Sequence, residues 1–366
     1  MILFSLKSKY RQAIPARFFL WHNPPLPPKQ IWFHACSFGE TRALKPLVEA
    51  VGRENTSVTT TTQTGFSEAA SLVKQRRYLP FEPLLWLWVR PQRALVVMEA
   101  ELWYLLFLVA KRRGAKTLLV NARISDRSYP AYRRFAWFYR RIFAQVDAVF
   151  AQSETDRKRL EELGARHVKV CGNIKLAYLP KATRKIAKPE GIVVTAASTH
   201  EGEEEGIVEA FLRWRRNHPD ARLVVVPRHP ERFGKVAAFL ERVAKKEGLS
   251  YGRWSEEESL NRDITLIDAM GELVNLYAVT DIVVLGGAFV PVGGHNPAEA
   301  VPFGCRLVTG PHIFNQKAMF EAVEGAHFCE AGRLQEGLEE AWRGGPLRLR
   351  TPVSLEPIVK ELRDVV

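Results

Sequence analysis

Short apolar runs alternate with longer amphipathic stretches along most of this chain. The first series of runs covers residues 31–36, 57–61, 94–98, 117–121, 148–152 and 168–171, of which 57–61 is rich in threonine. The second begins at Ile192 and continues through 221–226, 265–267, 282–285 and 306–308. Short apolar runs bounded by turn-forming residues are typical of buried strands. Strands that alternate with helices favour a parallel sheet covered on both faces. The pattern therefore predicts an α/β protein.

The chain is too long for a single core. Its 366 residues exceed the roughly 250–300 at which single cores stop growing. We expect a basic amphipathic N-terminal segment over residues 1–30, a first domain over 31–177, a charged linker over 178–191 and a second domain over 192–366. Two doubly wound, Rossmann-like domains would face one another across a cleft and bind ligands at the carboxyl ends of their strands.

The net charge of +13 is concentrated in the first half. Residues 1–180 hold 29 Lys and Arg against 13 Asp and Glu, whereas residues 181–366 hold 24 against 27. A basic half is compatible with nucleic acid, an anionic membrane surface or a phosphorylated substrate, and charge alone does not choose among them. No recognised nucleic-acid-binding module accompanies the charge, which argues against the first of these partners.

The four cysteines are scattered, and neither Cys-x-x-Cys nor zinc-like His spacing occurs, so the sequence predicts no metal site, no disulfide framework and a reduced, cytoplasmic setting. No apolar stretch is long enough and free enough of charge to predict a membrane-spanning helix. Residues 1–21 mix aromatic and apolar side chains with lysines and arginines. Such a segment can lie on a membrane surface or pack on its own domain.

Two glycine pairs bracket a short loop after the apolar run 282–285. Gly286-Gly287 and Gly293-Gly294 would let backbone amides approach a phosphate without an intervening Cβ. Asn296 is expected to cap a helix with Pro297 at its first position, so that the positive helix end faces the ligand. Glu299, one turn later, could reach a ribose hydroxyl.

Polar residues follow five predicted strands of the first half. Glu40 opens a helix after the first strand, where a carboxylate can take a proton from an attacking hydroxyl or simply stabilise its helix. Arg123 suits an anionic group. The other candidates that line this sheet edge are Ser37, Gly39, Thr64, Glu99 and Lys175.

Three segments of the second half offer contacts for a nucleotide. Arg228 follows an apolar strand and Pro227, and Met270-Gly271-Glu272 precedes a short helix. The third segment runs from Asn296 through Pro297 and Ala298 to Glu299. The sequence contains neither a P-loop nor the Gly-x-Ser-x-Gly elbow of α/β-hydrolases.

Several short sequence segments, taken in their order along the chain, resemble motifs of the lipid A Kdo transferase family, where Kdo is 3-deoxy-D-manno-octulosonic acid. The strings run from about His34 to Gly310 and comprise His34 to Glu40, Glu-Ala-Glu-Leu-Trp at 99–103, Asn-Ala-Arg at 121–123, Gly-Asn-Ile-Lys at 172–175, Ala-Ser-Thr-His-Glu at 197–201, Pro-Arg-His-Pro-Glu-Arg at 227–232, Met-Gly-Glu-Leu at 270–273 and Gly-Gly-His-Asn-Pro at 293–297. The resemblance implies the GT-B glycosyltransferase fold and inverting transfer of Kdo from CMP-Kdo to a lipid A precursor such as lipid IVA in lipopolysaccharide biosynthesis. The pattern also departs from the family: no Pro-Asn follows Trp103, and Ala288 replaces a serine.

By this resemblance Glu40 is the general base, and Glu99 and Lys175 assist at the transition state. CMP is held by Pro227, Arg228, Met270, Gly271, Glu272, Asn296, Pro297, Ala298 and Glu299, and the acceptor by Ser37, Gly39, Thr64 and Arg123. The resemblance implies no metal, no cofactor and no obligate protein partner, and it places the enzyme peripherally on the cytoplasmic face of the bacterial inner membrane. Two alternatives stay open: a related transferase with a different nucleotide donor, and a noncatalytic protein that binds anionic lipids.

Overall fold

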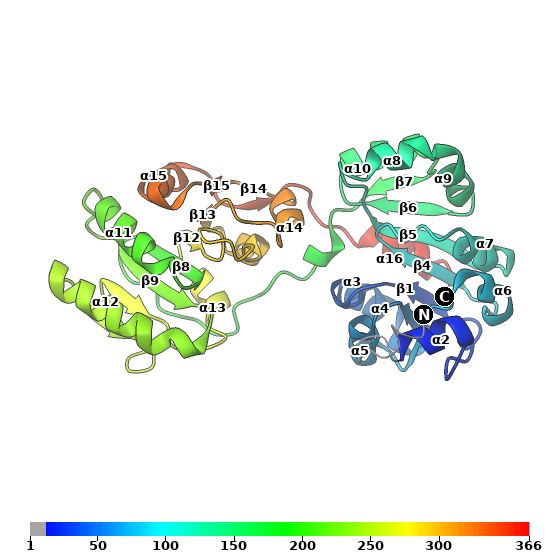
Figure 1. The fold of residues 1–366 in the computed structure, drawn as a ribbon, viewed down its shortest axis with the longest axis horizontal. Helices are drawn as coiled ribbons and strands as arrows, with labels where there is room; N and C mark the ends of the chain where they lie inside the picture. Colours follow the sequence, from blue (N-terminus) through cyan, green and yellow to red (C-terminus); the bar gives the residue numbers. More distant parts are fainter. Residues whose placement is uncertain (1–11, 366) are drawn as a thin grey trace. The chain divides into compact units, whose positions relative to one another are not determined.

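A computed structural model describes residues 12–365, which form two compact units. Of the described residues, unit 1 contains 12–178 and 351–365, and unit 2 contains Leu179–Arg350. Each unit is built on one fully parallel, seven-stranded sheet (Figure 1). The prediction of an α/β protein with parallel sheets is confirmed.

The sheet of unit 1 has the strand order β3-β2-β1-β4-β5-β6-β7. Its strands are β1 (Ile31–His34), β2 (Thr56–Thr60), β3 (Gln75–Tyr78), β4 (Ala94–Met98), β5 (Lys116–Ala122), β6 (Ala148–Ala151) and β7 (Val168–Val170). Successive side chains alternate between the faces, so Trp32 packs in one core and Ile31 and Phe33 in the other. The strand order reverses between β1 and β4, and we call the carboxyl ends of these two strands the switch point of unit 1.

Helices surround this sheet on both faces. They are α2 (Ala13–Phe19), α3 (Phe38–Ala43), α4 (Lys45–Val51), α5 (Gln63–Leu72), α6 (Leu85–Trp88), α7 (Tyr104–Arg112), α8 (Tyr129–Arg134), α9 (Ala136–Phe143), α10 (Glu154–Glu162) and α16 (Glu356–Arg363), with 3₁₀ turns at η2 (Arg53–Asn55), η3 (Glu82–Leu84) and η4 (Ile174–Leu176).

Unit 2 repeats the same winding, with the order β10-β11-β9-β8-β12-β13-β15. Its strands are β8 (Val193–Thr199), β9 (Arg222–Pro227), β10 (Tyr251–Arg253), β11 (Ile264–Leu266), β12 (Ile282–Leu285), β13 (Arg306–Thr309) and β15 (Ala326–Phe328), and a separate antiparallel pair joins β14 (Val323–Glu324) to β16 (Arg348–Leu349). The helical elements are α11 (Glu204–Arg215), α12 (Phe233–Glu247), α13 (Leu273–Tyr277), α14 (Lys317–Glu321), α15 (Leu334–Arg343), η5 (Pro230–Arg232), η6 (Pro297–Phe303) and η7 (Ala331–Arg333). The switch point of unit 2 lies at the ends of β8 and β12.

The end of the chain departs from the expected second domain over 192–366. From Thr351 the chain belongs to unit 1, where Ser354 donates its amide to the Cys171 carbonyl at 2.9 Å. The amphipathic helix α16 buries Ile358 and Leu362 in a core of unit 1 and contacts α4 (Figure 1). The last segment belongs to unit 1 because the apolar face of α16 is removed from water by packing against that core.

The expected N-terminal segment over residues 1–30 falls partly outside the described residues, because the description starts at residue 12. The helix α2 packs Ala13 and Ala16 against Tyr78, which is the arrangement expected of a helix that packs on its own domain. Phe19 and Trp21 remain exposed nearby. Within the described part of the chain, no helix is long and apolar enough to cross a membrane.

Candidate functional site

Glu40 lies in the first turn of α3 at the switch point of unit 1. Ser37 caps this helix, because its Oγ accepts a hydrogen bond from the Glu40 amide at 3.3 Å and donates to Glu40 Oε1 at 2.6 Å. The Cys36 amide donates to Glu40 Oε2 at 2.9 Å, and Glu40 is only 8% exposed. The carboxylate thus stabilises its helix and is also fixed in orientation. Its remaining lone pairs can still accept a proton.

Glu99, Asn121 and Lys175 come from three different strand ends and meet at one place. Lys175 Nζ forms an ion pair with Glu99 Oε1, to which Asn121 Nδ2 also donates at 3.4 Å. Asn121 Oδ1 accepts the amide of Ile174 at 2.9 Å, which ties η4 to the end of β5. Glu99 and Asn121 have φ values of +56° and +55°, a backbone conformation that is costly for residues other than glycine and is concentrated at functional sites.

A cavity of 330 Å³ beside this cluster contains two of the expected residues, Gly39 and Lys175. Its lining also includes Arg42 and Lys45, so it is basic. A Cβ at Gly39 would meet nothing within 4 Å. The absence of a side chain there therefore leaves open space that a ligand can use.

The three other acceptor candidates do not line this cavity; Ser37 caps α3 instead. Thr64 is exposed, and its hydroxyl lies 3.5 Å from that of Thr62, which donates to the Cys36 carbonyl at 2.6 Å. Arg123 is half-buried just past the end of β5. The structure therefore does not bring Thr64 and Arg123 into the same cavity as Gly39 and Lys175.

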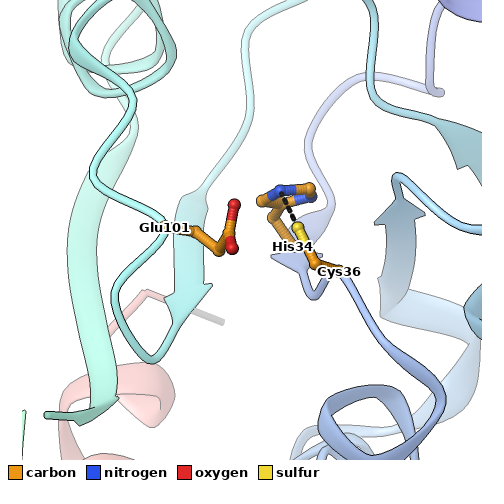
Figure 2. Close-up of side chains that lie close together, drawn as sticks. All are labelled: His34, Cys36 and Glu101. Atoms are coloured by element: carbon orange, nitrogen blue, oxygen red, sulfur yellow. Dashed lines mark hydrogen bonds between the residues drawn. The ribbon is translucent and has the colours of Figure 1, made fainter. Parts of the chain in front are cut away.

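His34, Cys36 and Glu101 form a cluster at the switch point of unit 1 that the sequence did not predict (Figure 2). One ligand atom from each lies within 4.8 Å of the other two. His34 is buried, and burial lowers its pKa to about 3, so the imidazole is neutral. Burial, followed by the charge of Glu101, raises the pKa of the Cys36 thiol, which therefore stays protonated and is no nucleophile.

Most of the expected donor residues share a cavity of 360 Å³ at the switch point of unit 2. The expected residues in its lining are Pro227, Arg228, Met270, Gly271, Asn296 and Glu299. Arg228 is exposed and offers a guanidinium to an anion. Burial raises the pKa of the Glu299 carboxyl, which Asn296 and Arg228 partly oppose.

Three expected donor residues do not line this cavity. Glu272 instead accepts hydrogen bonds from Arg184 Nε at 3.0 Å and Asn275 Nδ2 at 3.1 Å, so it holds the start of unit 2 against α13. Pro297 and Ala298 form the buried start of η6, where the Ala298 amide donates to Asn296 Oδ1 at 3.1 Å. Asn296 is thus the N-cap and Pro297 the first helical residue, as expected. The element is a 3₁₀ helix of 7 residues, so its dipole is weaker than that of the expected α-helix.

The expectation that the glycine amides are available to a phosphate is wrong. Gly286 donates to the Ala197 carbonyl at 2.9 Å, and Gly287 donates to Glu203 Oε2 at 2.8 Å. The amides of Gly293 and Gly294 both donate to the Gly287 carbonyl. These glycines instead permit close packing, since a Cβ at Gly286 would come within 2.8 Å of Glu203 Oε2.

Glu203 organises this loop from the neighbouring strand end. It is 2% exposed, and besides the Gly287 amide it accepts those of His200 at 2.8 Å and Phe289 at 3.0 Å. Sequence analysis did not single out Glu203, because two of its three donors, Gly287 and Phe289, come from a segment that is distant along the chain.

Sequence analysis also missed other residues of the donor cavity, among them Ser198, His295 and Gln316. His295 Nε2 lies 2.9 Å from His200 Nε2. Burial, then the charges of His200 and Arg228, lowers the pKa of His295 to about 4, so the imidazole is neutral at pH 7. The only signal in the sequence was its position in the Gly-Gly-His-Asn-Pro string.

The sequence and fold both have known relatives. The family model for 3-deoxy-D-manno-octulosonic-acid transferases (kdotransferases) matches residues 12–178. The 3-deoxy-D-manno-octulosonic acid transferase of Haemophilus influenzae is 33% identical over 93% of this chain and 84% of its own length, and that of Bordetella pertussis is 34% identical over 78% and 72%.

Among solved structures, the UDP-GlcNAc 2-epimerase of Neisseria meningitidis, bound to UDP-GlcNAc, aligns with 92% of this chain and 99% of its own. The TM-score is 0.52 and the identity 11%, so this likeness concerns the fold alone. The expected class, two Rossmann-like domains of the GT-B type, is confirmed. The sequence relatives show that this chain belongs to the family of 3-deoxy-D-manno-octulosonic acid transferases.

Proposed function

We propose that this protein transfers Kdo from CMP-Kdo to a lipid A precursor, lipid IVA, with inversion at the anomeric carbon. The observation that carries the proposal is the Glu40 carboxylate, held by the Cys36 amide and the Ser37 hydroxyl at the switch point of unit 1 in a chain of this family. In doubly wound sheets, ligands bind at this point.

In the proposed reaction, Glu40 takes the proton of an acceptor sugar hydroxyl. The hydroxyl oxygen then forms a bond to the anomeric carbon of Kdo, while the bond between that carbon and the phosphate oxygen breaks and CMP leaves with the electron pair. Lys175 is proposed to stabilise the developing negative charge, and Glu99, which follows β4, orients it through their ion pair. General-base catalysis of this kind contributes typically 10²–10⁴ in rate.

We propose that CMP occupies the 360 Å³ cavity of unit 2, with its phosphate on Arg228 and its ribose near Glu299. Glu272 acts there indirectly by fixing α13, and Pro297 and Ala298 act by shaping the start of η6. A monophosphate leaving group carries less charge than a diphosphate. We therefore propose that transfer needs neither a metal ion nor another cofactor.

The acceptor is proposed to bind unit 1, where a basic and apolar cavity of 780 Å³ lies between α2 and β3. Phe66 and Tyr78 stack at 4.4 Å in its wall, and the Arg76 guanidinium lies 5.0 Å from the Phe66 ring. Arg76 Nε is buried and has no hydrogen-bond partner within the described residues. An amphiphile with acyl chains and phosphates matches such a lining.

The outer face of α8 and α9 supports peripheral attachment to an anionic membrane. Trp137 is 58% exposed, with the Arg141 guanidinium 5.3 Å from its ring, and Phe135 is 50% exposed. Exposed aromatic side chains interleaved with arginines suit a lipid–water interface. We propose attachment to the cytoplasmic face of the inner membrane without an obligate protein partner. Binding to vesicles that contain anionic lipid should weaken as salt is added, and salt-independent binding would contradict this.

The direct test is mass spectrometry of the product formed by purified protein, CMP-Kdo and a tetraacyl lipid A precursor. The expected result is a mass increase by one or more Kdo residues. Calorimetry with CMP, UMP and UDP tests the donor, because preference for UDP would favour the alternative of a different nucleotide. Lipid binding without any transfer would favour the alternative of a noncatalytic lipid-binding protein.

A further inference from the structure

The cluster of His34, Cys36 and Glu101 brings three different metal-binding groups to one place. His34 ends β1, Cys36 follows two residues later, and Glu101 lies in the loop after β4. The imidazole, thiol and carboxylate point toward one another, with ligand atoms within 4.8 Å (Figure 2). Because β1 and β4 are neighbours in the sheet, rigid elements position the three groups.

The surroundings of His34 fix which ring nitrogen is available. Nδ1 lies 3.1 Å from the Thr59 carbonyl oxygen, which can only accept, and 3.0 Å from the Thr59 hydroxyl oxygen, which accepts from Trp32 Nε1 and donates to the Phe33 carbonyl. Both contacts are satisfied when Nδ1 carries the proton and donates it. Nε2 is therefore unprotonated and faces Cys36 Sγ at 3.9 Å. Histidines that bind metals commonly donate their other ring N–H to a backbone carbonyl in this way.

Glu101 is oriented by a similar outer contact. Trp103 Nε1 donates to Glu101 Oε2 at 2.6 Å, which fixes the carboxylate and leaves Oε1 for another partner. Figure 2 shows the carboxylate turned toward His34 and Cys36. Two of the three groups thus already have supporting hydrogen bonds.

We propose that His34 Nε2, Cys36 Sγ and the Glu101 carboxylate bind one Zn²⁺ ion. Nitrogen, sulfur and oxygen ligands together favour zinc over Mg²⁺ or Ca²⁺, which prefer oxygen alone. Cys36 releases its thiol proton to solvent on binding, so the neutral imidazole, the thiolate and the carboxylate balance the two charges of the ion. Water completes a tetrahedral site. This ion takes no part in the proposed transfer.

The proposed zinc site is directly linked to the proposed base, because the backbone amide of the ligand Cys36 donates a hydrogen bond to Glu40 Oε2. Contraction of the cluster around an ion would shift Cys36 and disturb this contact. Zinc should therefore inhibit the proposed transfer rather than support it, and a chelator should restore activity.

Cobalt titration of the full chain, stripped with a chelator, tests the site without any activity assay. The unaltered protein should bind one equivalent of Co²⁺ with a thiolate-to-metal charge-transfer band in the near ultraviolet. Zinc should then displace the cobalt and abolish the band. Because the readout is a metal spectrum, the result does not depend on whether the proposed transfer is correct.

Two variants and one control complete the experiment. Cys36→Ser should lose the band, and Glu101→Gln should weaken cobalt binding by about tenfold or more. Cys329→Ser alters the other half-buried thiol, in unit 2, and should leave the band intact. Circular dichroism confirms that each variant is folded. Absence of the band from the unaltered protein, or its persistence in folded Cys36→Ser, would overturn the proposal.

Discussion

Removal of the Glu203 side chain should destabilise unit 2 and open the donor cavity. In Glu203→Ala the amides of His200, Gly287 and Phe289 lose a charged acceptor. Hydrogen bonds to charged groups contribute about 1.5–3 kcal/mol each, and an unsatisfied buried donor costs about 1–3 kcal/mol. The Gly287 contact is fully buried, whereas water can reach the other two amides more easily. We therefore expect a loss of about 3–5 kcal/mol in the free energy of unfolding of unit 2.

Urea unfolding combined with hydrogen exchange measures this effect. Peptides that contain residues 286–290 should exchange much faster in Glu203→Ala, and calorimetry should show weaker CMP binding. Glu205→Ala is the matched control, since Glu205 is exposed in the first turn of α11, directly after the N-cap residue Glu203. If Glu203→Ala unfolds at the same urea concentration as Glu205→Ala, the reasoning about the buried amides is refuted.

Three further outcomes follow from the structure. Arg228→Gln should weaken CMP binding about tenfold, the equivalent of 1.4 kcal/mol for one charge-assisted contact; unchanged calorimetric affinity would contradict the donor site. Ile358→Ala should destabilise unit 1 by about 2–5 kcal/mol, seen in urea unfolding, whereas an effect confined to unit 2 would contradict the placement of α16. His295 has a folded-state pKa of about 4, below its ordinary value of 6.5, so the unfolded chain binds more protons between these values. Its stabilising contribution should be complete above pH 6.5 and fall as pH approaches 4, and a pH–stability profile unchanged in His295→Asn would refute this.

Most strands of both sheets could be predicted from the sequence, because the sheets are parallel and their central strands are buried. Fully buried strands have apolar runs, and β4 has the predicted bounds, residues 94–98. Strand β3, Gln-Arg-Arg-Tyr, was not expected because it lies at the sheet edge and is only half-buried, so its residues carry no apolar signature. The same holds for the edge strand β10. The return of α16 to unit 1 was also beyond prediction, since an amphipathic pattern does not reveal which core it covers.

The candidate site also contains features that the sequence predicted and features that it did not. The sequence analysis placed Glu99 and Lys175 at the carboxyl ends of strands, and these ends share one edge of a parallel sheet. In the structure the two side chains form an ion pair. The glycine pairs were misinterpreted, since local sequence does not show that a distant carboxylate, Glu203, already occupies the Gly287 amide. For the same reason the approach of Glu101 to His34 could not be read from the chain.

The central claim is that the Glu40 carboxylate is the proton acceptor. Glu40→Gln keeps the size of the side chain. Its amide oxygen can accept from the Cys36 amide, and its NH2 group can donate to the Ser37 hydroxyl, which accepts as well as donates. The decisive measurement is the single-turnover rate of Kdo transfer by this variant, with Glu54→Gln, an exposed carboxylate of η2, as the control. The account predicts a rate lower by about 10²–10⁴ with calorimetric CMP affinity retained. Transfer by Glu40→Gln at the rate of Glu54→Gln would contradict it.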